Sequence, residues 1–352
     1  MTDAAMKDAA KQGVAMPRGA AQRAMDQKTK PPGSLGRLES WAIRLAEIQG
    51  TLEPTVEKAR VLVFAADHGV AAEGVSAYPR EVTAQMMANF ASGGAAIHVL
   101  CRSAGIEVEV VDVGVDAELL DLPQVVHSKV RRGSRNLLHE PAMTAEEMEA
   151  AWQVGVEAVQ RARAAGCDAV GLGEMGIGNT TPSAALLSHF TGRSPEETVG
   201  RGTGVSDDVW AHKRDVVRRA LGRHSSPQDA RHALAALGGL ELASMAGAAT
   251  AAAQSQIPVV VDGFISTVAA LAAVRIEPTL RPALFFAHRS AEAGHRIALE
   301  ALEAEPMLNL DLRLGEATGA ALAIPLLQAA ARVLREMATF DSAGVSTEVE
   351  AP

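Results

Sequence analysis

The chain has 352 residues, of which 48% are hydrophobic and 21% are charged, and its formal net charge is −9. This composition fits one large or two smaller globular domains and excludes a disordered polyelectrolyte. The negative charge and an aromatic content of only 3% argue against a general nucleic-acid binder, which needs a basic face and stacking platforms.

The first 60 residues are predicted to form N-terminal helices. A polar stretch over residues 18–30 ends at Pro31, Pro32 and Gly33, which together are a strong break. Beyond the break, apolar residues recur at helical spacing until Gly50, and they are Leu35, Leu38, Trp41, Ala42, Leu45 and Ile48.

Short apolar runs then alternate with long helical stretches. The runs cover residues 61–66, 107–112, 167–172, 257–261 and 283–287, and the helical stretches include 145–165, 208–222 and 240–254. This alternation is typical of βαβ units, in which helices cover both faces of a parallel sheet. We therefore expect a three-layer α/β domain with a mostly parallel, Rossmann-like sheet over residues 61–316.

A polar residue stands at the carboxyl end of each predicted strand. These residues are Asp67, Asp112, Glu174, Asp262 and His288. Ligands bind at this edge of open α/β sheets. Aspartate and histidine are also common in turns and helix caps, so each residue alone fits either interpretation. Five of them at one edge favour a binding site there.

The C-terminal part of the sequence returns to helix. Residues 320–338 are almost wholly apolar, which predicts a helix buried inside the fold or at a subunit interface, with a kink at Pro325. We expect residues 1–60 and 317–340 to form a small helical subdomain beside the sheet, and residues 341–352 to be a frayed tail.

The Gly-rich stretch at residues 171–183 contains the spacing of a dinucleotide-binding fingerprint in Gly171, Gly173 and Gly176. The glycines continue to Gly178, however, and about twenty residues later the sequence predicts a helix start instead of a strand ending in an acid. A dinucleotide site is therefore disfavoured.

The same stretch fits a cradle for a single phosphate, because a Gly-rich loop before a helix exposes backbone N–H groups to an anion. We expect Thr181 as the helix cap and Pro182 at the first helical position. A second Gly-rich turn at residues 200–204 is followed by Lys213, which either neutralises the same phosphate or is an ordinary surface lysine. A capped turn without a ligand is the alternative for the whole stretch.

Two carboxylates are candidates for a general base. Glu174 lies in the Gly-rich loop, and Glu316 precedes the apolar C-terminal helix. Apolar surroundings raise the pKa of a carboxyl group and so suit it to accept a proton, although a first-turn glutamate also simply favours the helix dipole. No metal site is predicted, because His288 and His295 are seven residues apart and no recognised metal-ligand spacing occurs.

Six blocks of sequence, at residues 30–39, 66–70, 173–182, 262–264, 290–292 and 313–322, lie in order along the chain. The longest of them read Gly-Glu-Met-Gly-Ile-Gly-Asn-Thr-Thr-Pro at 173–182 and Arg-Leu-Gly-Glu-Ala-Thr-Gly-Ala-Ala-Leu at 313–322. Together these blocks resemble the nicotinate-nucleotide–dimethylbenzimidazole phosphoribosyltransferase family. The resemblance covers residues 20–340.

The resemblance implies transfer of the phosphoribosyl group of nicotinate mononucleotide to 5,6-dimethylbenzimidazole. The products would be α-ribazole 5′-phosphate and nicotinate, with inversion at C1′. Glu316 would be the general base and Glu174 the second carboxylate. The residues expected to bind the substrates are Gly176, Ile177, Gly178, Asn179, Thr180, Gly202, Thr203, Lys213, Asp262, Ser290, Leu314, Tyr78 and Met86.

Tyr78 and Met86 stand at positions where members of the family differ, so the base preference stays open. We expect a cytoplasmic homodimer with no cofactor, no metal, no nucleic-acid partner and no membrane span. Two alternatives on the same fold remain. One is a nucleotide-binding module without turnover, which two desolvated carboxylates argue against, and the other is a metal-dependent phosphohydrolase using Asp67, His68 and His288.

Overall fold

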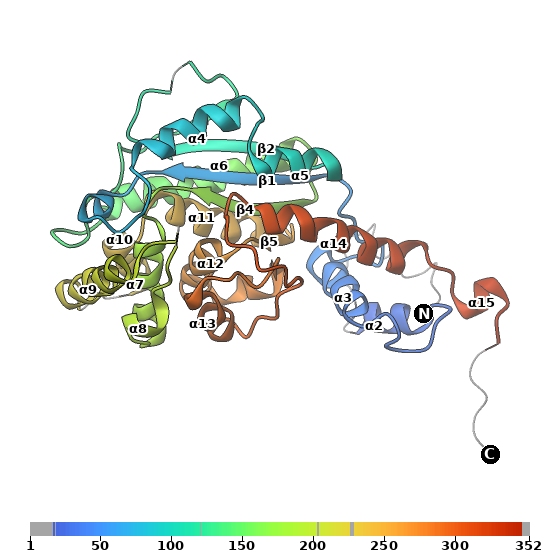
Figure 1. Ribbon diagram of the computed structural model, residues 1–352. Helices are drawn as coiled ribbons and strands as arrows, with labels where there is room; N and C mark the ends of the chain where they lie inside the picture. Colours follow the sequence, from blue (N-terminus) through green and yellow to red (C-terminus); the bar gives the residue numbers. More distant parts are fainter. Residues whose placement is uncertain (1–16, 18, 120, 203, 226–228, 347–352) are drawn as a thin grey trace.

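A parallel six-stranded sheet forms the centre of the computed structural model, which describes residues 17, 19–119, 121–202, 204–225 and 229–346 (Figure 1). The strands are β1 (Ala59–Ala66), β2 (Glu107–Gly114), β3 (Val125–His127), β4 (Ala169–Met175), β5 (Val259–Val261) and β6 (Leu284–Phe286). They lie in the order β3-β2-β1-β4-β5-β6, and each neighbouring pair is parallel. The expected α/β fold with a parallel sheet is confirmed.

Helices cover both faces of this sheet, and other helices pack around these or lie beyond the sheet. They are α2 (Ala20–Asp26), α3 (Arg37–Gln49), α4 (Glu81–Ala91), α5 (Ala96–Ala104), α6 (Ala145–Ala164), α7 (Thr180–Thr191), α8 (Pro195–Thr198), α9 (Asp207–Arg223), α10 (Ala230–Leu237), α11 (Leu240–Gln254), α12 (Phe264–Ile276), α13 (Ala293–Ala301), α14 (Thr318–Glu336) and α15 (Phe340–Ala343). Two short 3₁₀ helices, η1 (Gly69–Glu73) and η2 (Pro278–Ala283), follow β1 and precede β6.

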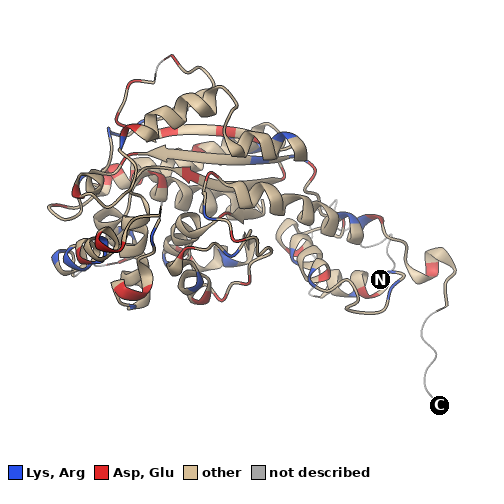
Figure 2. Ribbon diagram, viewed as in Figure 1, with Lys and Arg blue, Asp and Glu red and all other residues tan. Residues whose placement is uncertain are grey.

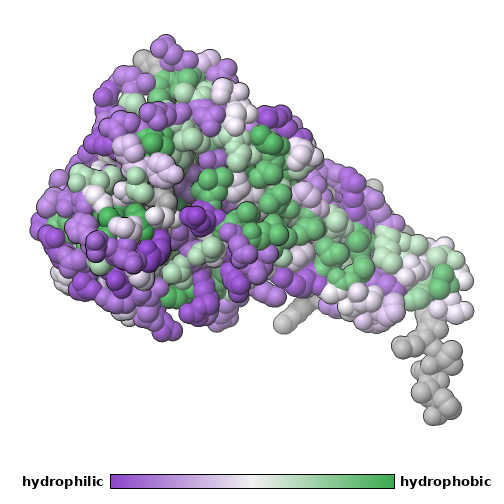
Figure 3. All heavy atoms as spheres, viewed as in Figure 1, coloured by the Kyte–Doolittle hydropathy of each residue, from purple (hydrophilic) through white to green (hydrophobic). Residues whose placement is uncertain are grey.

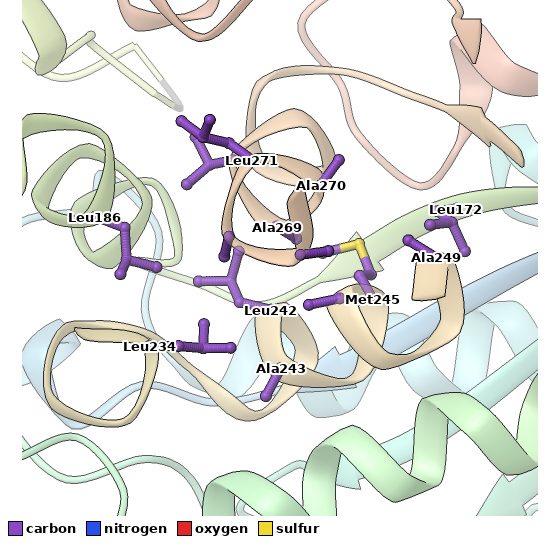
Figure 4. Close-up of a cluster of buried hydrophobic side chains, with 14 of the residues drawn as sticks. Leu172, Leu186, Leu234, Leu242, Ala243, Met245, Ala249, Ala269, Ala270 and Leu271 are labelled. Atoms are coloured by element: carbon purple, nitrogen blue, oxygen red, sulfur yellow. The ribbon is translucent and has the colours of Figure 1, made fainter. Parts of the chain in front are cut away.

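The sheet separates two hydrophobic cores, because alternate residues of each strand point to opposite faces. Leu62 and Phe64 of β1 face a large core with α6, α7 and α10–α13, whereas Val61 and Val63 face a second core with α3, α4, α5 and α14. Figure 4 shows part of the first core, where side chains of α11 and α12 meet Leu186, Leu234 and Leu172. Burial on both faces explains why β1 has no polar alternation.

Helices α6 and α11 approach each other unusually closely on the first face. A Cβ atom added to Gly155 of α6 would lie 1.8 Å from the backbone oxygen of Ser244 in α11. The Ser244 hydroxyl donates a hydrogen bond to the backbone oxygen of Ala151, 2.7 Å away. The missing side chain at Gly155 therefore allows backbone-to-backbone packing between the two helices.

Helices α2 and α3 pack against the second half of α14 (Figure 1). A third apolar cluster joins these helices, with members Ala21, Met25, Ala42, Ala46, Ala330 and Leu334. Helix α14 continues through Pro325 from Thr318 to Glu336. The expected frayed tail, residues 341–352, begins inside the short helix α15 (Phe340–Ala343), and residues 347–352 lie outside the described part of the chain.

Lys and Arg residues are interspersed with Asp and Glu along the outer helices (Figure 2). In the part of the chain that the structure describes, no helix combines the length and the apolar character that a membrane crossing requires.

Candidate active site

The site lies at the carboxyl edge of the sheet, beside its topological switch point. The chain runs from β1 to β2 on one side and later returns to β4 on the other side of β1, so the loops after β1 and β4 diverge. Such a divergence opens a crevice for a ligand. A cavity of about 340 Å³ occupies this edge, and its walls come from α4, the loops after β4, β5 and β6, and the segment before α14.

Most of the predicted site residues line this cavity. They are Tyr78, Met86, Glu174, Gly176, Ile177, Asn179, Thr180, Gly202, Asp262, Ser290, Leu314 and Glu316. Lys213 lies buried behind Thr180, and the α-carbon of Gly178 faces Ala71. Thr203, which was also predicted to bind substrate, lies outside the described residues.

Glu174 stands at the end of β4 and is buried. The side-chain amide of Asn179 donates a hydrogen bond to its Oε2 atom. Burial raises the pKa of Glu174 well above its ordinary value, and the nearby charges of Glu241 and Asp262 add to this effect. The site therefore holds several carboxyl groups that disfavour one another's ionisation.

The start of α7 differs from the sequence prediction by two residues. Thr181 was expected as the cap, but α7 begins at Thr180 and Asn179 is the residue before it. The backbone N–H of Asn179 already bonds to Gly176, and that of Thr181 bonds to Gly178, so the chain turns into the helix earlier. Pro182 is tolerated in the first turn of α7, because backbone N–H groups in a first turn have no partner within the helix and proline lacks only this group.

Lys213 of α9 places a buried ammonium group beneath the first turn of α7. Its Nζ atom is 2.6 Å from the Thr180 hydroxyl oxygen, and burial lowers the pKa of Lys213 to about 8. A side chain at Gly202, where φ is +54°, would lie 3.2 Å from this Nζ atom. The loop before α7, the helix N-terminus and the lysine together can hold an anion such as a phosphate.

Glu316 lies on an unusual backbone turn. Gly315, Glu316 and Ala317 have φ values of 88°, 60° and 65°, so three consecutive residues are left-handed. The backbone N–H of Glu316 is 3.3 Å from the Glu174 backbone oxygen, which ties the turn to β4. Gly173 of β4 provides the space, since an added Cβ atom there would lie 2.3 Å from the Ala317 nitrogen.

The Glu316 side chain is also buried, and its Oε2 atom has no hydrogen-bond partner among the described residues. Burial raises the pKa of Glu316, and a hydrogen bond from the Ile97 backbone partly offsets this rise. A desolvated carboxylate on a backbone of strained conformation is suited to accept a proton at a defined position.

Asp262 connects β5 to the first turn of α14. Its Oδ1 atom accepts hydrogen bonds from the backbone N–H groups of Gly319 and Ala320, at 2.7 and 3.1 Å. Burial raises the pKa of Asp262 to about 7. His288 lies next to it, with its Nε2 atom 3.7 Å from the same oxygen. Asp262 thereby holds the helix that directly follows Glu316.

The cavity lining also includes apolar and aromatic side chains. Tyr78 and Leu314 are exposed, and Val82 and Met86 belong to α4. Flat, apolar surroundings of this kind suit an aromatic ring, and a methionine adapts to its shape.

Two of the strand-end acids have structural roles instead. Asp67 Oδ2 accepts a hydrogen bond from the backbone of Asp116 at 2.8 Å, and Asp112 Oδ1 accepts one from Val115 at 2.9 Å. His68 is fully buried and pairs with Glu241 at 2.9 Å, and the charge of Glu241 helps to raise the pKa of His68. Over the described ranges, no three His, Cys, Asp or Glu side chains are grouped so that they could hold a metal ion.

Several lining residues were not predicted to bind substrate, and they are Val82, Met175, Gly263, Phe264, Ile265, Ser266, His288, Glu292, Arg313 and Gly315. The sequence did contain a signal that could have indicated many of these residues. His288 ends a predicted strand, and Gly263, Phe264, Glu292, Arg313 and Gly315 lie inside the blocks at 262–264, 290–292 and 313–322. Met175 lies in the block at 173–182, and nothing in the sequence pattern singled out the other three, which are Val82, Ile265 and Ser266.

Comparisons with known proteins show which family the chain resembles. A family model described as phosphoribosyltransferase (DBI_PRT) matches residues 14–345. The chain is similar to nicotinate-nucleotide–dimethylbenzimidazole phosphoribosyltransferases of Geobacter sp. strain M21, with 51% identity, and of Cupriavidus taiwanensis, with 52% identity, each over 93% of this chain and 94% of the relative. A crystal structure of CobT from Thermus thermophilus superposes with a TM-score of 0.90 and 51% identity, covering 93% of this chain and 98% of that one.

Proposed function

The chain belongs to the nicotinate-nucleotide–dimethylbenzimidazole phosphoribosyltransferase family and is thus a glycosyltransferase-type enzyme, and we propose that it makes the lower nucleotide of cobalamin. In this proposal nicotinate mononucleotide donates its phosphoribosyl group to 5,6-dimethylbenzimidazole. The products are α-ribazole 5′-phosphate and nicotinate.

The observation that carries the proposal is the position of Glu316. Its buried carboxyl group lies on the cavity wall that also includes Met86 and Leu314, where an aromatic ring fits. The loop before α7, with Lys213 beneath it, lines the same cavity and suits a phosphate. One cavity therefore offers a proton acceptor, an apolar wall and an anion site.

The chemistry follows from the two substrates. The ring nitrogen of dimethylbenzimidazole that carries no hydrogen attacks C1′ of the ribose. The bond from C1′ to the nicotinate nitrogen breaks, and nicotinate leaves with the bonding electron pair. The proton on the other benzimidazole nitrogen passes to Glu316. Because the leaving group is already a pyridinium ion, no general acid is needed, and attack from the opposite face inverts the β-nucleotide to an α product.

The crowded carboxyl groups contribute to the same step. Positive charge develops on the ribose as the pyridinium leaves, and preorganised negative potential favours that charge. Glu174 and Glu316 both have raised pKa values because they are buried, and the charge of Glu316 raises the pKa of Glu174 further. A developing cation between them relieves this repulsion. Holding two substrates in one cavity supplies a further large part of the rate.

The test is incubation with nicotinate mononucleotide and dimethylbenzimidazole, followed by mass and NMR analysis of the products. We expect α-ribazole 5′-phosphate and an equal amount of nicotinate. A β product, or release of ribose 5-phosphate without transfer, would contradict the mechanism. A parallel reaction with EDTA should retain activity, and loss that a divalent ion restores would instead favour a metal-dependent phosphohydrolase.

A further inference from the structure

Glu292 is a carboxylate of the cavity wall to which the mechanism above gives no role. It directly precedes α13, in the loop that follows β6, and it is half-buried. Its Oε2 atom is buried and has no hydrogen-bond partner in the described part of the protein. Leaving a buried carboxylate oxygen unpaired costs free energy unless a ligand supplies the missing donor.

The position of this oxygen places it beside the phosphate cradle. A Cβ atom added to Gly200 would lie 2.0 Å from Glu292 Oε2, so the carboxylate lies against the start of the Gly-rich turn that includes Gly202. Gly202 in turn adjoins Thr180 and Lys213. The charge of Glu292 raises the pKa of Lys213, whereas the lysine donates its hydrogen bond to Thr180.

A carboxylate next to an anion site repels the anion, so phosphate binding alone does not explain it. An ionised carboxylate only accepts hydrogen bonds, and its two oxygens match a pair of neighbouring hydroxyl groups. In the proposed substrate, the sugar that connects the 5′-phosphate to C1′ carries such a pair. With the phosphate at the loop before α7 and C1′ toward Glu316, the ribose must lie between these two places.

We propose that Glu292 accepts hydrogen bonds from the ribose hydroxyls of the mononucleotide, and so positions the sugar and selects ribose over deoxyribose. This inference rests on the proposed function, because it needs a phosphoribosyl substrate in the cavity. The competing interpretation is that Glu292 only supports Lys213 and the turn at Gly200, without touching the sugar.

The test compares Glu292→Gln with the unaltered protein on three substrates, namely nicotinate mononucleotide and its 2′-deoxy and 3′-deoxy analogues. Dimethylbenzimidazole is kept saturating. Comparing the two proteins on the same substrate removes the intrinsic reactivity of each sugar. Glu300→Gln, the same change at an exposed position of α13, is the matched control.

We expect Glu292→Gln to lower kcat/KM for nicotinate mononucleotide by about 10- to 100-fold, the effect of losing hydrogen bonds to a charged group. Each deoxy analogue lacks one of the two hydroxyl groups, so the loss caused by Glu292→Gln should be smaller on both analogues than on nicotinate mononucleotide. An equal loss on all three substrates would assign Glu292 a supporting role only. No loss on any substrate would show that it does not contact the sugar, and both results overturn the proposal.

A binding measurement separates this inference from the proposed reaction. Calorimetric titration with ribose 5-phosphate and 2-deoxyribose 5-phosphate requires no turnover. Glu292→Gln should weaken binding of ribose 5-phosphate more than binding of its deoxy form. If the protein prefers ribose 5-phosphate in this way but transfers nothing to dimethylbenzimidazole, then the proposed function fails while the role of Glu292 stands. Equal binding of the two sugars by the unaltered protein overturns the role of Glu292.

Discussion

Glu316 combines a buried side chain with a backbone conformation that residues other than glycine rarely adopt. The conformation persists because Gly173 leaves room for Ala317 and because Glu174 binds the Glu316 backbone. Left-handed backbone of this kind costs on the order of 1–3 kcal/mol per residue and is concentrated at functional positions. The carboxyl group is thus held where its position matters more than the stability of the turn.

The direct test of this residue is Glu316→Gln. The amide keeps the shape of the side chain but cannot accept the benzimidazole proton, so we expect kcat to fall by about 10²–10⁴-fold. Binding of nicotinate mononucleotide, measured by calorimetry, should change little. Turnover close to that of the unaltered protein at neutral pH would remove Glu316 from the proposed mechanism, and an intermediate loss would indicate that Glu174 shares the role.

The lowered pKa of Lys213 predicts that binding of the mononucleotide depends on pH. Its pKa of about 8 means that the ammonium form, which attracts phosphate, is lost as the pH rises through that value. We therefore expect kcat/KM for the mononucleotide to fall above about pH 8. The buried charge also costs stability below pH 8, and this cost is relieved as the pH rises toward the unfolded value of 10.5.

Steady-state kinetics across the pH range check this prediction. Lys213→Arg should extend activity to higher pH, because the guanidinium stays charged, although its larger head fits less well behind Thr180. Lys213→Met should raise KM for the mononucleotide below about pH 8, where the unaltered protein carries the ammonium charge, and leave KM for the base nearly unchanged. An alkaline limb that is identical in all three proteins would assign it to another group.

The residues of the site were predictable where they lie in long motifs. The blocks around Glu174 and Glu316 indicated the carboxyl groups and the phosphate loop, and the structure places both on one cavity. Glu292 and His288 were harder to assign, because their importance depends on loops that are distant in sequence. No spacing rule indicates that the Glu292 carboxylate lies against Gly200.

Among the elements, the pair α6 and α11 depends on a missing side chain. Gly155 lets the backbones of the two helices touch, and its neighbours there are backbone atoms that cannot rotate away. Gly155→Ala should therefore destabilise the protein by about 1–3 kcal/mol, as overpacking does in cores. Urea denaturation measures the change.

The matched control is Gly222→Ala in α9, where an added Cβ atom meets nothing within 4 Å. There alanine should stabilise the protein by about 0.5–1 kcal/mol through its higher helix propensity. If both substitutions had the same effect, close packing at Gly155 would not be the reason for its sensitivity.

Strands with a buried apolar run were predictable whatever their length. The five apolar runs became β1, β2, β4, β5 and β6, of which β5 and β6 have only three residues, all buried. The strand that was missed, β3, lies at the edge of the sheet, and only its first residue is buried. The start of α7 was misplaced because the hydrogen bonds that begin it come from the glycine turn at Gly176 and Gly178, which propensity rules for caps do not describe.

At the scale of the whole molecule, one view shows apolar side chains gathered over α5 and α14 and on toward the N-terminal helices (Figure 3). Val99 of α5 and Leu314 beside α14 are more than half exposed, at 52% and 59%. Continuous apolar surface of this kind marks an interaction site. We predict that a second copy of the chain covers it.

Light scattering on the protein as it elutes from a sizing column decides this point. We expect about twice the chain mass of 36.6 kDa at micromolar concentration. A monomer mass under these conditions would refute the homodimer, and the exposed apolar surface would then need another explanation.

The packing of α2 and α3 on α14 has a consequence for how the protein is made. Helices α2 and α3 are near the start of the chain, and α14 is near its end. The apolar faces of α2 and α3 therefore cannot be covered by α14 until nearly all of residues 20–336 have been synthesised. Residues 313–316, which come just before this late helix, are also the last part of the chain to line the cavity. In the proposed mechanism, catalytic competence is therefore among the last properties that a nascent chain acquires. A ribosome-bound chain that stops before Glu316 has neither that carboxylate nor a partner for its first helices. Contacts of such long sequence separation also slow folding, so an intermediate with an exposed apolar surface is a natural substrate for chaperones.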